Sequence, residues 1–154
     1  MRVATVDGLV TLFYDGSKEL WNQELIDEWQ ERRQNIGHVE EDDNWESWDL
    51  SNECKEYFRE RFSWQQVIVE GVMEIPEFTF SGCFNIKRVI FADTVIRIEH
   101  GAFFRCYNLV FIKLSLRLEY IGECAFELCN LSSVFVPPSC REIGMGAFLS
   151  LIHI

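Results

Sequence analysis

Apolar positions in the second half of the chain repeat with a period of about 23 residues. Each of four copies has an Ile followed five residues later by a Phe, and three copies have a Cys three residues after the Phe. A period of this length is typical of solenoids, in which each copy forms one coil and stacked coils bury a common core. The repeated positions are Ile75, Ile98, Ile121 and Ile143; Phe80, Phe103, Phe126 and Phe148; and Cys83, Cys106 and Cys129.

A second pattern in each copy predicts a short strand. Apolar residues occupy the first, fourth and sixth positions of segments 86–91, 109–114 and 131–136. Because side chains alternate across a strand, the fourth and sixth positions point into the coil and the residues between them point outward. We expect the strands of successive coils to lie side by side and parallel. Residues 67–69 predict one more strand, in a preliminary coil ahead of Ile75.

Residues 1–65 hold all five Trp and do not follow the repeat. Two apolar segments, 3–6 and 9–14, flank Asp7-Gly8, a dipeptide that favours the tight two-residue turn of a hairpin. Because the first coil of a solenoid needs a cover for its open edge, we expect residues 1–65 to form a cap on repeats that span residues 66–154. A separate binding module is the alternative for this aromatic-rich part.

Two helices are predicted within this cap. The first begins after an N-cap at Ser17 and runs to about Gln34, and the second starts at Ser51 and runs to about Phe62. Four consecutive carboxylates at residues 40–43 predict a solvated linker between them. The predicted apolar faces consist of Leu20, Trp21, Leu25 and Trp29 in the first helix and of Cys54, Tyr57, Phe58 and Phe62 in the second.

The motifs of the last two copies resemble the BspA-like class of leucine-rich repeats. They read Ile121-Gly-Glu-Cys-Ala-Phe-Glu-Leu-Cys-Asn-Leu131 and Ile143-Gly-Met-Gly-Ala-Phe148. The resemblance covers residues 66 to the end and implies an α+β protein: a short solenoid of coils of about 23 residues with stacked parallel strands, behind a small cap formed by the hairpin and helices. It also implies recognition of proteins or surfaces by the exposed strand face, without catalysis.

The acidic composition narrows the range of partners. The net charge is −11, and residues 1–65 account for −9 of it. Phosphate backbones and anionic lipids repel such a chain, so we expect no nucleic-acid partner and no membrane insertion. No apolar segment follows a positive N-terminal stretch, and no stretch approaches a transmembrane span. Six cysteines without a secretory signal favour reduced thiols and a cytoplasmic location.

The usual patterns of catalytic and metal-binding residues are missing from the sequence. The three His are scattered, and we expect His100 to be an exposed turn residue. The repeated Cys of successive coils would form a straight line at a spacing of about 5 Å, which suits neither a disulfide nor a tetrahedral zinc site. We therefore expect these Cys to fill the core as small apolar side chains, and we expect no enzyme activity and no metal or cofactor.

The candidate site is the outward face of the predicted strands. Exposed apolar side chains beside cations are typical of protein-binding surfaces, and the cations favour an acidic partner. The alternative is that the N-terminal part or a further repeat covers this face. The outward residues are Ile90, Lys113 and Phe135 in one line and Arg88, Phe111 and Ser133 beside it.

Three functional hypotheses remain open at this point. The first is a protein-interaction module that binds a partner on the strand face. The second is a fragment of a surface or adhesion leucine-rich repeat protein, and the third is a regulatory segment of a larger protein. The sequence stops in mid-repeat after Phe148. We therefore expect the repeat region to be truncated at its C-terminus.

Overall fold

The computed structural model describes residues 2–36 and 45–150. In these two ranges the chain forms nine strands, two α-helices and two short 3-10 helices. In chain order they are β1 (Arg2–Val6), β2 (Leu9–Tyr14), η1 (Lys18–Leu20), α1 (Gln23–Ile36), η2 (Trp45–Ser47), α2 (Asn52–Ser63), β3 (Gln66–Val69), β4 (Glu74–Ile75), β5 (Arg88–Phe91), β6 (Arg97–Ile98), β7 (Phe111–Lys113), β8 (Tyr120–Ile121) and β9 (Glu142–Ile143).

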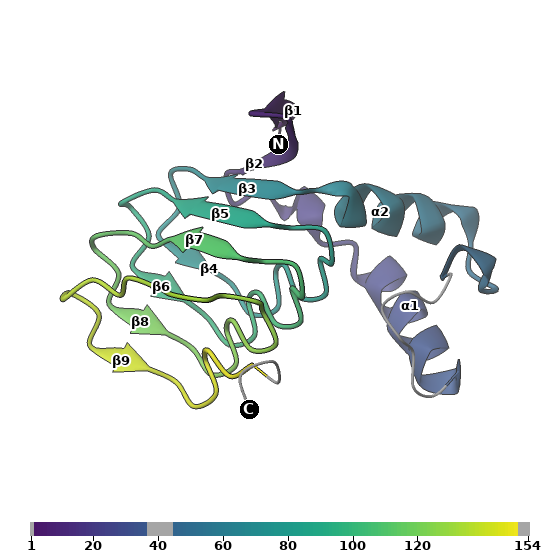
Figure 1. The fold of residues 1–154 in the computed structure, drawn as a ribbon. Helices are drawn as coiled ribbons and strands as arrows, with labels where there is room; N and C mark the ends of the chain where they lie inside the picture. Colours follow the sequence, from purple (N-terminus) through teal and green to yellow (C-terminus); the bar gives the residue numbers. More distant parts are fainter. Residues whose placement is uncertain (1, 37–44, 151–154) are drawn as a thin grey trace.

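Two sheets form the sides of the predicted solenoid (Figure 1). One has the strand order β1-β2-β3-β5-β7 and the other the order β4-β6-β8-β9. Arg88 pairs with Phe111 and Ile98 pairs with Ile121, so each coil advances the chain by about 23 residues. The predicted period and parallel stacking are confirmed. The second sheet was not predicted, because its strands are only two residues long and the sequence indicates no alternation there.

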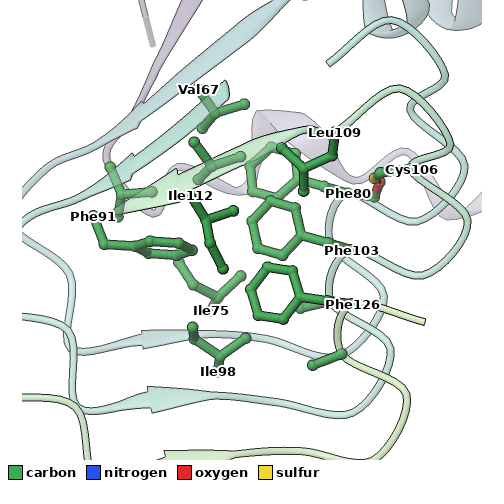
Figure 2. Close-up of a cluster of buried hydrophobic side chains, with 14 of the residues drawn as sticks. Val67, Ile75, Phe80, Phe91, Ile98, Phe103, Cys106, Leu109, Ile112 and Phe126 are labelled. Atoms are coloured by element: carbon green, nitrogen blue, oxygen red, sulfur yellow. The ribbon is translucent and has the colours of Figure 1, made fainter. Parts of the chain in front are cut away.

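The aromatic rings of the repeats stack along the solenoid (Figure 2). The ring centroids of Phe80 and Phe103 are 5.1 Å apart, those of Phe103 and Phe126 are 5.2 Å apart, and those of Phe126 and Phe148 are 5.5 Å apart. The angle between ring planes falls from 16° in the first pair to 2° in the last. The first three of these rings are fully buried, so the line of Phe rings forms the centre of the core.

The prediction of a strand at residues 131–136 is wrong. This segment has no regular strand structure, although Leu131, Val134 and Val136 still pack against the core. The copy is one residue shorter than its predecessor and runs into Pro137-Pro138, whose nitrogens carry no hydrogen for a backbone ladder. The core also thins here, since Ile143 is 48% exposed.

The N-terminal hairpin extends the first sheet. Asp7 and Gly8 have φ angles of 52° and 80°, which confirms the predicted two-residue turn between β1 and β2. β2 then pairs in parallel with β3, the first strand of the solenoid. Leu12 and Tyr14 point inward and join the common core, where the Tyr14 ring meets Phe80 edge-on at 5.3 Å. The hairpin thus lies on the edge of the first coil.

The first helix begins later than predicted. Residue Ser17 donates its backbone N–H to Asp15 Oδ1 within a turn, and the short η1 follows. The α-helix starts only at Gln23, where the Asn22 side chain accepts a hydrogen bond from the Leu25 N–H. An Asn side chain caps a helix as well as Ser does, so propensity did not distinguish the two positions. The predicted linker at 40–43 lies outside the described residues.

The second helix and its N-cap are confirmed. Ser51 Oγ accepts a hydrogen bond from the Cys54 N–H, and α2 extends to Ser63. Cys54, Phe58 and Phe62 are buried, together with Leu25 of α1, in a second apolar cluster apart from the solenoid core. The ring centroids of Phe62 and Phe84 of the first coil are 4.9 Å apart, and this contact joins the cluster to the repeats.

Arg61 links α2 to both neighbouring parts of the chain. It is only 5% exposed, although it carries a charge. Its Nη1 donates to the Leu20 carbonyl at 2.9 Å, and its Nη2 donates to the Thr79 carbonyl of the first coil. Tyr57, one turn earlier, also donates its hydroxyl to the Leu20 carbonyl. A single guanidinium therefore joins η1, α2 and the solenoid.

Candidate binding face

Side chains that point outward from the first sheet form two lines across its strands. The residues between them, such as Leu12, Val67 and Val89, are buried. We call the two lines together the strand face. The strand face consists of Phe13, Ile68, Ile90 and Lys113 in the first line and of Thr11, Gln66, Arg88 and Phe111 in the second, as the strand register places them. Thr11 and Gln66 belong to this side of the sheet but are buried.

Four of the six predicted face residues lie together on this surface. Ile90 and Lys113 are partners in the register of β5 and β7, and Arg88 and Phe111 are partners one step earlier. The remaining two, Ser133 and Phe135, lie on the segment that does not form a strand. Both are exposed, and Phe135 is 70% exposed, but they have no register with β7. They border the strand face instead of continuing it.

Hydrogen bonds order the second line of the strand face. Gln66 Nε2 donates to Thr11 Oγ1 at 2.9 Å, and Arg88 Nε donates to Gln66 Oε1 at 3.1 Å. The Arg88 guanidinium then lies over the Phe111 ring, 4.8 Å from its centroid. Because a cation over an aromatic face is attracted to it, Arg88 is held in place and shields one side of the ring. Phe111 nevertheless remains 42% exposed.

The strand face carries two cations, Arg88 and Lys113, and none of the eight residues that define it is a carboxylate; a third cation lies beside it. β1 adds Arg2, which pairs with Phe13 and places its guanidinium 3.8 Å from the centroid of that ring. Arg2, Arg88 and Lys113 thus lie on the same side of the sheet. The positive sign contrasts with the net charge of −11 for the whole chain. The strand face is therefore a local exception to the acidic surface, and its cations lie beside aromatic and aliphatic side chains.

Sequence reasoning missed the N-terminal half of the strand face. Phe13, Ile68 and Gln66 come from strands that the pattern had predicted, but the parallel pairing of β2 with β3 was not foreseen. Residues 11 and 66 are separated by 55 positions, and no repeat relates them. The sequence feature that could have indicated this pairing is the alternation of inward and outward side chains, which is the same in β2 and β3. In Figure 1 the hairpin continues the sheet, and α1 and α2 lie to one side of it.

The Cys side chains of the repeats make hydrogen bonds that the sequence did not reveal. Cys106 Sγ donates to the Phe80 carbonyl at 3.1 Å, and Cys129 Sγ donates to the Phe103 carbonyl at 3.3 Å. Each thiol therefore contacts the backbone of the preceding coil. Burial raises the pKa of the Cys83 thiol and raises that of Cys106 strongly. In the described ranges, no group of three or more His, Cys, Asp or Glu is arranged to hold a metal ion.

His100 lies in a turn, as expected, and is half-buried there. Its ring meets that of Phe78 at 5.1 Å, and Nδ1 is 3.9 Å from a carboxylate oxygen of Glu123 in the next coil. A polar contact of this length at a surface contributes at most about 1 kcal/mol. We therefore assign His100 to the packing of neighbouring turns.

Comparison with known proteins agrees with the solenoid geometry. A family profile described as BspA type leucine-rich repeat region (six copies) matches residues 47–154. The chain belongs to the BspA-type leucine-rich repeat family. The match to the BspA-type profile begins ahead of α2 and so includes that helix as well as the coils. No curated protein matches the chain.

Two solved structures are similar to this BspA-type chain. A leucine-rich repeat protein from Eubacterium ventriosum ATCC 27560 shares 27% identity over 61% of this chain and 25% of its own, with a TM-score of 0.56. A leucine-rich repeat protein from Bacteroides ovatus ATCC 8483 shares 31% identity over 56% of this chain and 24% of its own, with a TM-score of 0.52. The chain thus spans about a quarter of the length of each of these structures.

Membership in the BspA-type family places the chain in a broad functional class. Leucine-rich repeat proteins commonly mediate protein interaction or surface adhesion, and they are typically binding modules without enzymatic activity. Among the helices that the structure describes, none is both long and apolar enough to cross a membrane.

Proposed function

We propose that this BspA-type chain binds an acidic protein partner on its strand face. The observation that carries the proposal is the sign and character of this surface in a strongly acidic chain. Arg2, Arg88 and Lys113 lie there beside the exposed Phe111 and the half-buried side chains of Phe13, Ile68 and Ile90. An apolar surface bordered by charge is typical of protein-binding sites. Complementary charge would speed the encounter with an acidic partner and select against basic ones.

Preorganisation of the aromatic side chains supports the same proposal. Phe111 and Phe13 are each held by an arginine lying over the ring. A side chain that is already ordered loses less conformational entropy when a partner covers it, so a larger part of the buried area contributes to affinity. Phe111 would then serve as an anchor, with Ile90 beside it, and Phe135 would extend the contact at the border of the strand face.

The proposal is tested by capture of partners from a native lysate with mass-spectrometric readout. The wild-type chain is compared with the variant Phe111→Asp/Phe135→Asp, which adds two negative charges to the exposed aromatic positions. We expect the variant to lose a defined set of proteins by more than tenfold, because a carboxylate in an apolar contact is desolvated without a partner and repels acidic proteins.

A matched control adds the same charge elsewhere. Met73→Asp/Met145→Asp changes two exposed Met, 65% and 84% exposed, that do not belong to the strand face. This control is expected to retain the proteins that the Phe variant loses. Equal capture by all three chains, at equal melting temperature and circular dichroism, would show that the strand face is not the binding site.

A further inference from the structure

A cleft lies between the helices α1 and α2 and the turns of the first two coils, and Ile26, Trp29 and Phe58 of the helices' apolar cluster line it. Its volume is about 360 Å³, at the lower end of the range of about 300–1,000 Å³ for small-molecule pockets. Aromatic rings from both sides line it. Its walls include Trp21, Ile26 and Trp29 on the helical side and Phe78, Phe104 and Arg105 on the coil side.

Two arginines line this cleft, one from the helices and one from the coils. Arg33 comes from α1 and Arg105 from the second coil, and both line the same space. Burial, and after it the nearby charge of Arg105, lowers the pKa of Arg33 below its usual value. Each guanidinium lies near an aromatic ring: Arg33 is 4.5 Å from the Trp29 centroid, and Arg105 is 5.1 Å from that of Phe104. The rings therefore orient both cations.

These cations have no counter-charge in the described part of the chain. Within residues 2–36 and 45–150, neither Arg33 nor Arg105 forms an ion pair. Glu77 is the single carboxylate among these residues that lines the cleft, and it forms no ion pair with Arg33 or Arg105. Arg105 Nε and Trp29 Nε1 are both buried without a hydrogen-bond partner. Unpaired buried donors of this kind are rare in folded proteins and call for a partner.

The third arginine of the cleft already has hydrogen-bond partners within the protein. Arg61 also lines this space, but its guanidinium donates to the carbonyls of Leu20 and Thr79. It adds positive potential without needing a ligand. Arg33 and Arg105 differ from it, because their guanidinium groups carry donors that remain available in the cleft. Two guanidiniums that line one cleft and lie near enough for their charges to interact suit a carboxylate or phosphate, whose oxygens accept paired hydrogen bonds.

We propose that the cleft between α1 and the first two coils binds a small anion, in which a carboxylate or phosphate group joined to a flat apolar body meets Arg33 and Arg105. The aromatic walls contact the flat body, and the two guanidiniums hold the anionic oxygens. The binding of such a ligand relieves the repulsion between the arginines and gives the buried donors an acceptor. This site is separate from the strand face and does not depend on the function proposed for it.

The test is a titration of the isotopically labelled full chain followed by nuclear magnetic resonance of the Trp indole N–H groups. The probes are benzoate, phenyl phosphate, the neutral analogue benzyl alcohol, acetate and inorganic phosphate. We expect benzoate or phenyl phosphate to shift the Trp29 indole resonance in a saturable way. Benzyl alcohol, which lacks the charge, and acetate and inorganic phosphate, which lack the flat body, are expected to bind at least tenfold more weakly. The ratio of benzoate to phenyl phosphate affinity identifies the preferred anionic group.

Arginine variants assign the effect to the cleft. Arg33→Gln and Arg105→Gln are each expected to weaken the better probe at least tenfold, whereas Arg59→Gln is expected to change nothing. Arg59 is exposed and lies 3.5 Å from Glu46, so it matches the charge change away from the cleft. Equal affinity for benzoate and benzyl alcohol, or unchanged affinity in Arg33→Gln, would overturn the proposal. If Arg105→Gln does not fold, the Arg33 variant and the neutral probe still decide the question.

Discussion

Phe103 lies at the centre of the stacked rings, and its removal would take away packing contacts from the rings on both sides. It is fully buried between Phe80 and Phe126, at centroid distances of 5.1 Å and 5.2 Å. We expect Phe103→Ala to lower the free energy of unfolding by about 3–5 kcal/mol, because it removes a large apolar side chain and leaves a cavity that both neighbours border. Guanidinium chloride unfolding, with the midpoint and slope fitted separately, measures the loss.

The matched control is another Phe of the same repeats. Phe135 is 70% exposed, and Phe135→Ala is expected to change stability by less than about 0.5 kcal/mol. A midpoint for Phe103→Ala that equals the wild-type midpoint would mean that the ring stack does not carry the core.

Single residues also show where sequence patterns stop being informative. The repeat period is enough to predict that Phe80, Phe103 and Phe126 are buried, since the same residue type returns at the same place. It does not predict that Phe78, Cys124 and Leu128 adopt positive φ angles of 57° to 63°. These residues donate their N–H groups to the next coil, so the stacking imposes a conformation that their side chains disfavour.

At the scale of elements, the attachment of α2 depends on the guanidinium of Arg61. We expect Arg61→Lys to cost about 2–4 kcal/mol, because one ammonium does not reach the carbonyls of both Leu20 and Thr79 and hydrogen bonds to charged groups contribute about 1.5–3 kcal/mol each. Hydrogen exchange followed by mass spectrometry locates the effect. Peptides from η1 and α1 are expected to exchange faster, while peptides around Phe103 keep their protection.

The neighbouring Arg59 provides the comparison for this substitution. It lies on the same helix but is exposed, with Glu46 at 3.5 Å. Arg59→Lys is expected to alter stability by less than about 0.5 kcal/mol. If Arg61→Lys loosens the helices and the coils equally, the guanidinium supports the whole molecule and not the junction alone.

The elements that sequence analysis predicted well are those with a local cause. The Asp7-Gly8 hairpin and the Ser51 cap each depend on a few neighbouring residues, and both are confirmed. The start of α1 was wrong because Ser17 and Asn22 are equally good caps and tertiary packing decides between them. The burial of Arg61 could have been inferred from one sequence feature. Arg61 follows Tyr57 and Phe58 at helical spacing and therefore lies on the buried face of α2.

At the scale of the whole molecule, the buried thiols and Tyr14 lower the free energy of unfolding as the pH becomes alkaline. Burial is the largest cause of the raised pKa at Cys83, Cys106 and Tyr14, and it raises the pKa of Tyr14 to about 12. The unfolded chain begins to lose these protons near pH 8.5 for Cys and pH 10 for Tyr, whereas the folded chain keeps them. Stability is therefore fully present below about pH 8 and falls as the pH rises beyond it.

Urea unfolding between pH 7 and pH 10.5 measures this dependence. Each group contributes up to about 1.4 kcal/mol per pH unit once its unfolded form is deprotonated. Cys106→Ala removes one group, so its alkaline slope is expected to be shallower by up to that amount, whatever its stability at pH 7. A slope identical to wild type would mean that Cys106 does not titrate differently in the folded and unfolded chains.

The candidate site was predicted only in part, because some of its residues follow the repeat and others do not. The repeat brings Arg88, Ile90, Phe111 and Lys113 together, because their spacing follows the period of the coils. Phe13 and Gln66 meet that surface through a pairing between distant strands. The cleft with Arg33 and Arg105 depends on how a helix lies against the turns, which neither period nor propensity specifies.

The pairing of β2 with β3 also has a consequence for the order of folding. Neighbouring coils join segments about 23 residues apart, whereas Thr11 and Gln66 meet across 55 residues. Closing the longer loop costs only about 0.8 kcal/mol more. However, the edge that receives the hairpin exists only once β3 is held by β5. We therefore expect the coils to form first and the hairpin to dock last, although the hairpin precedes the coils in the sequence and is synthesised before them.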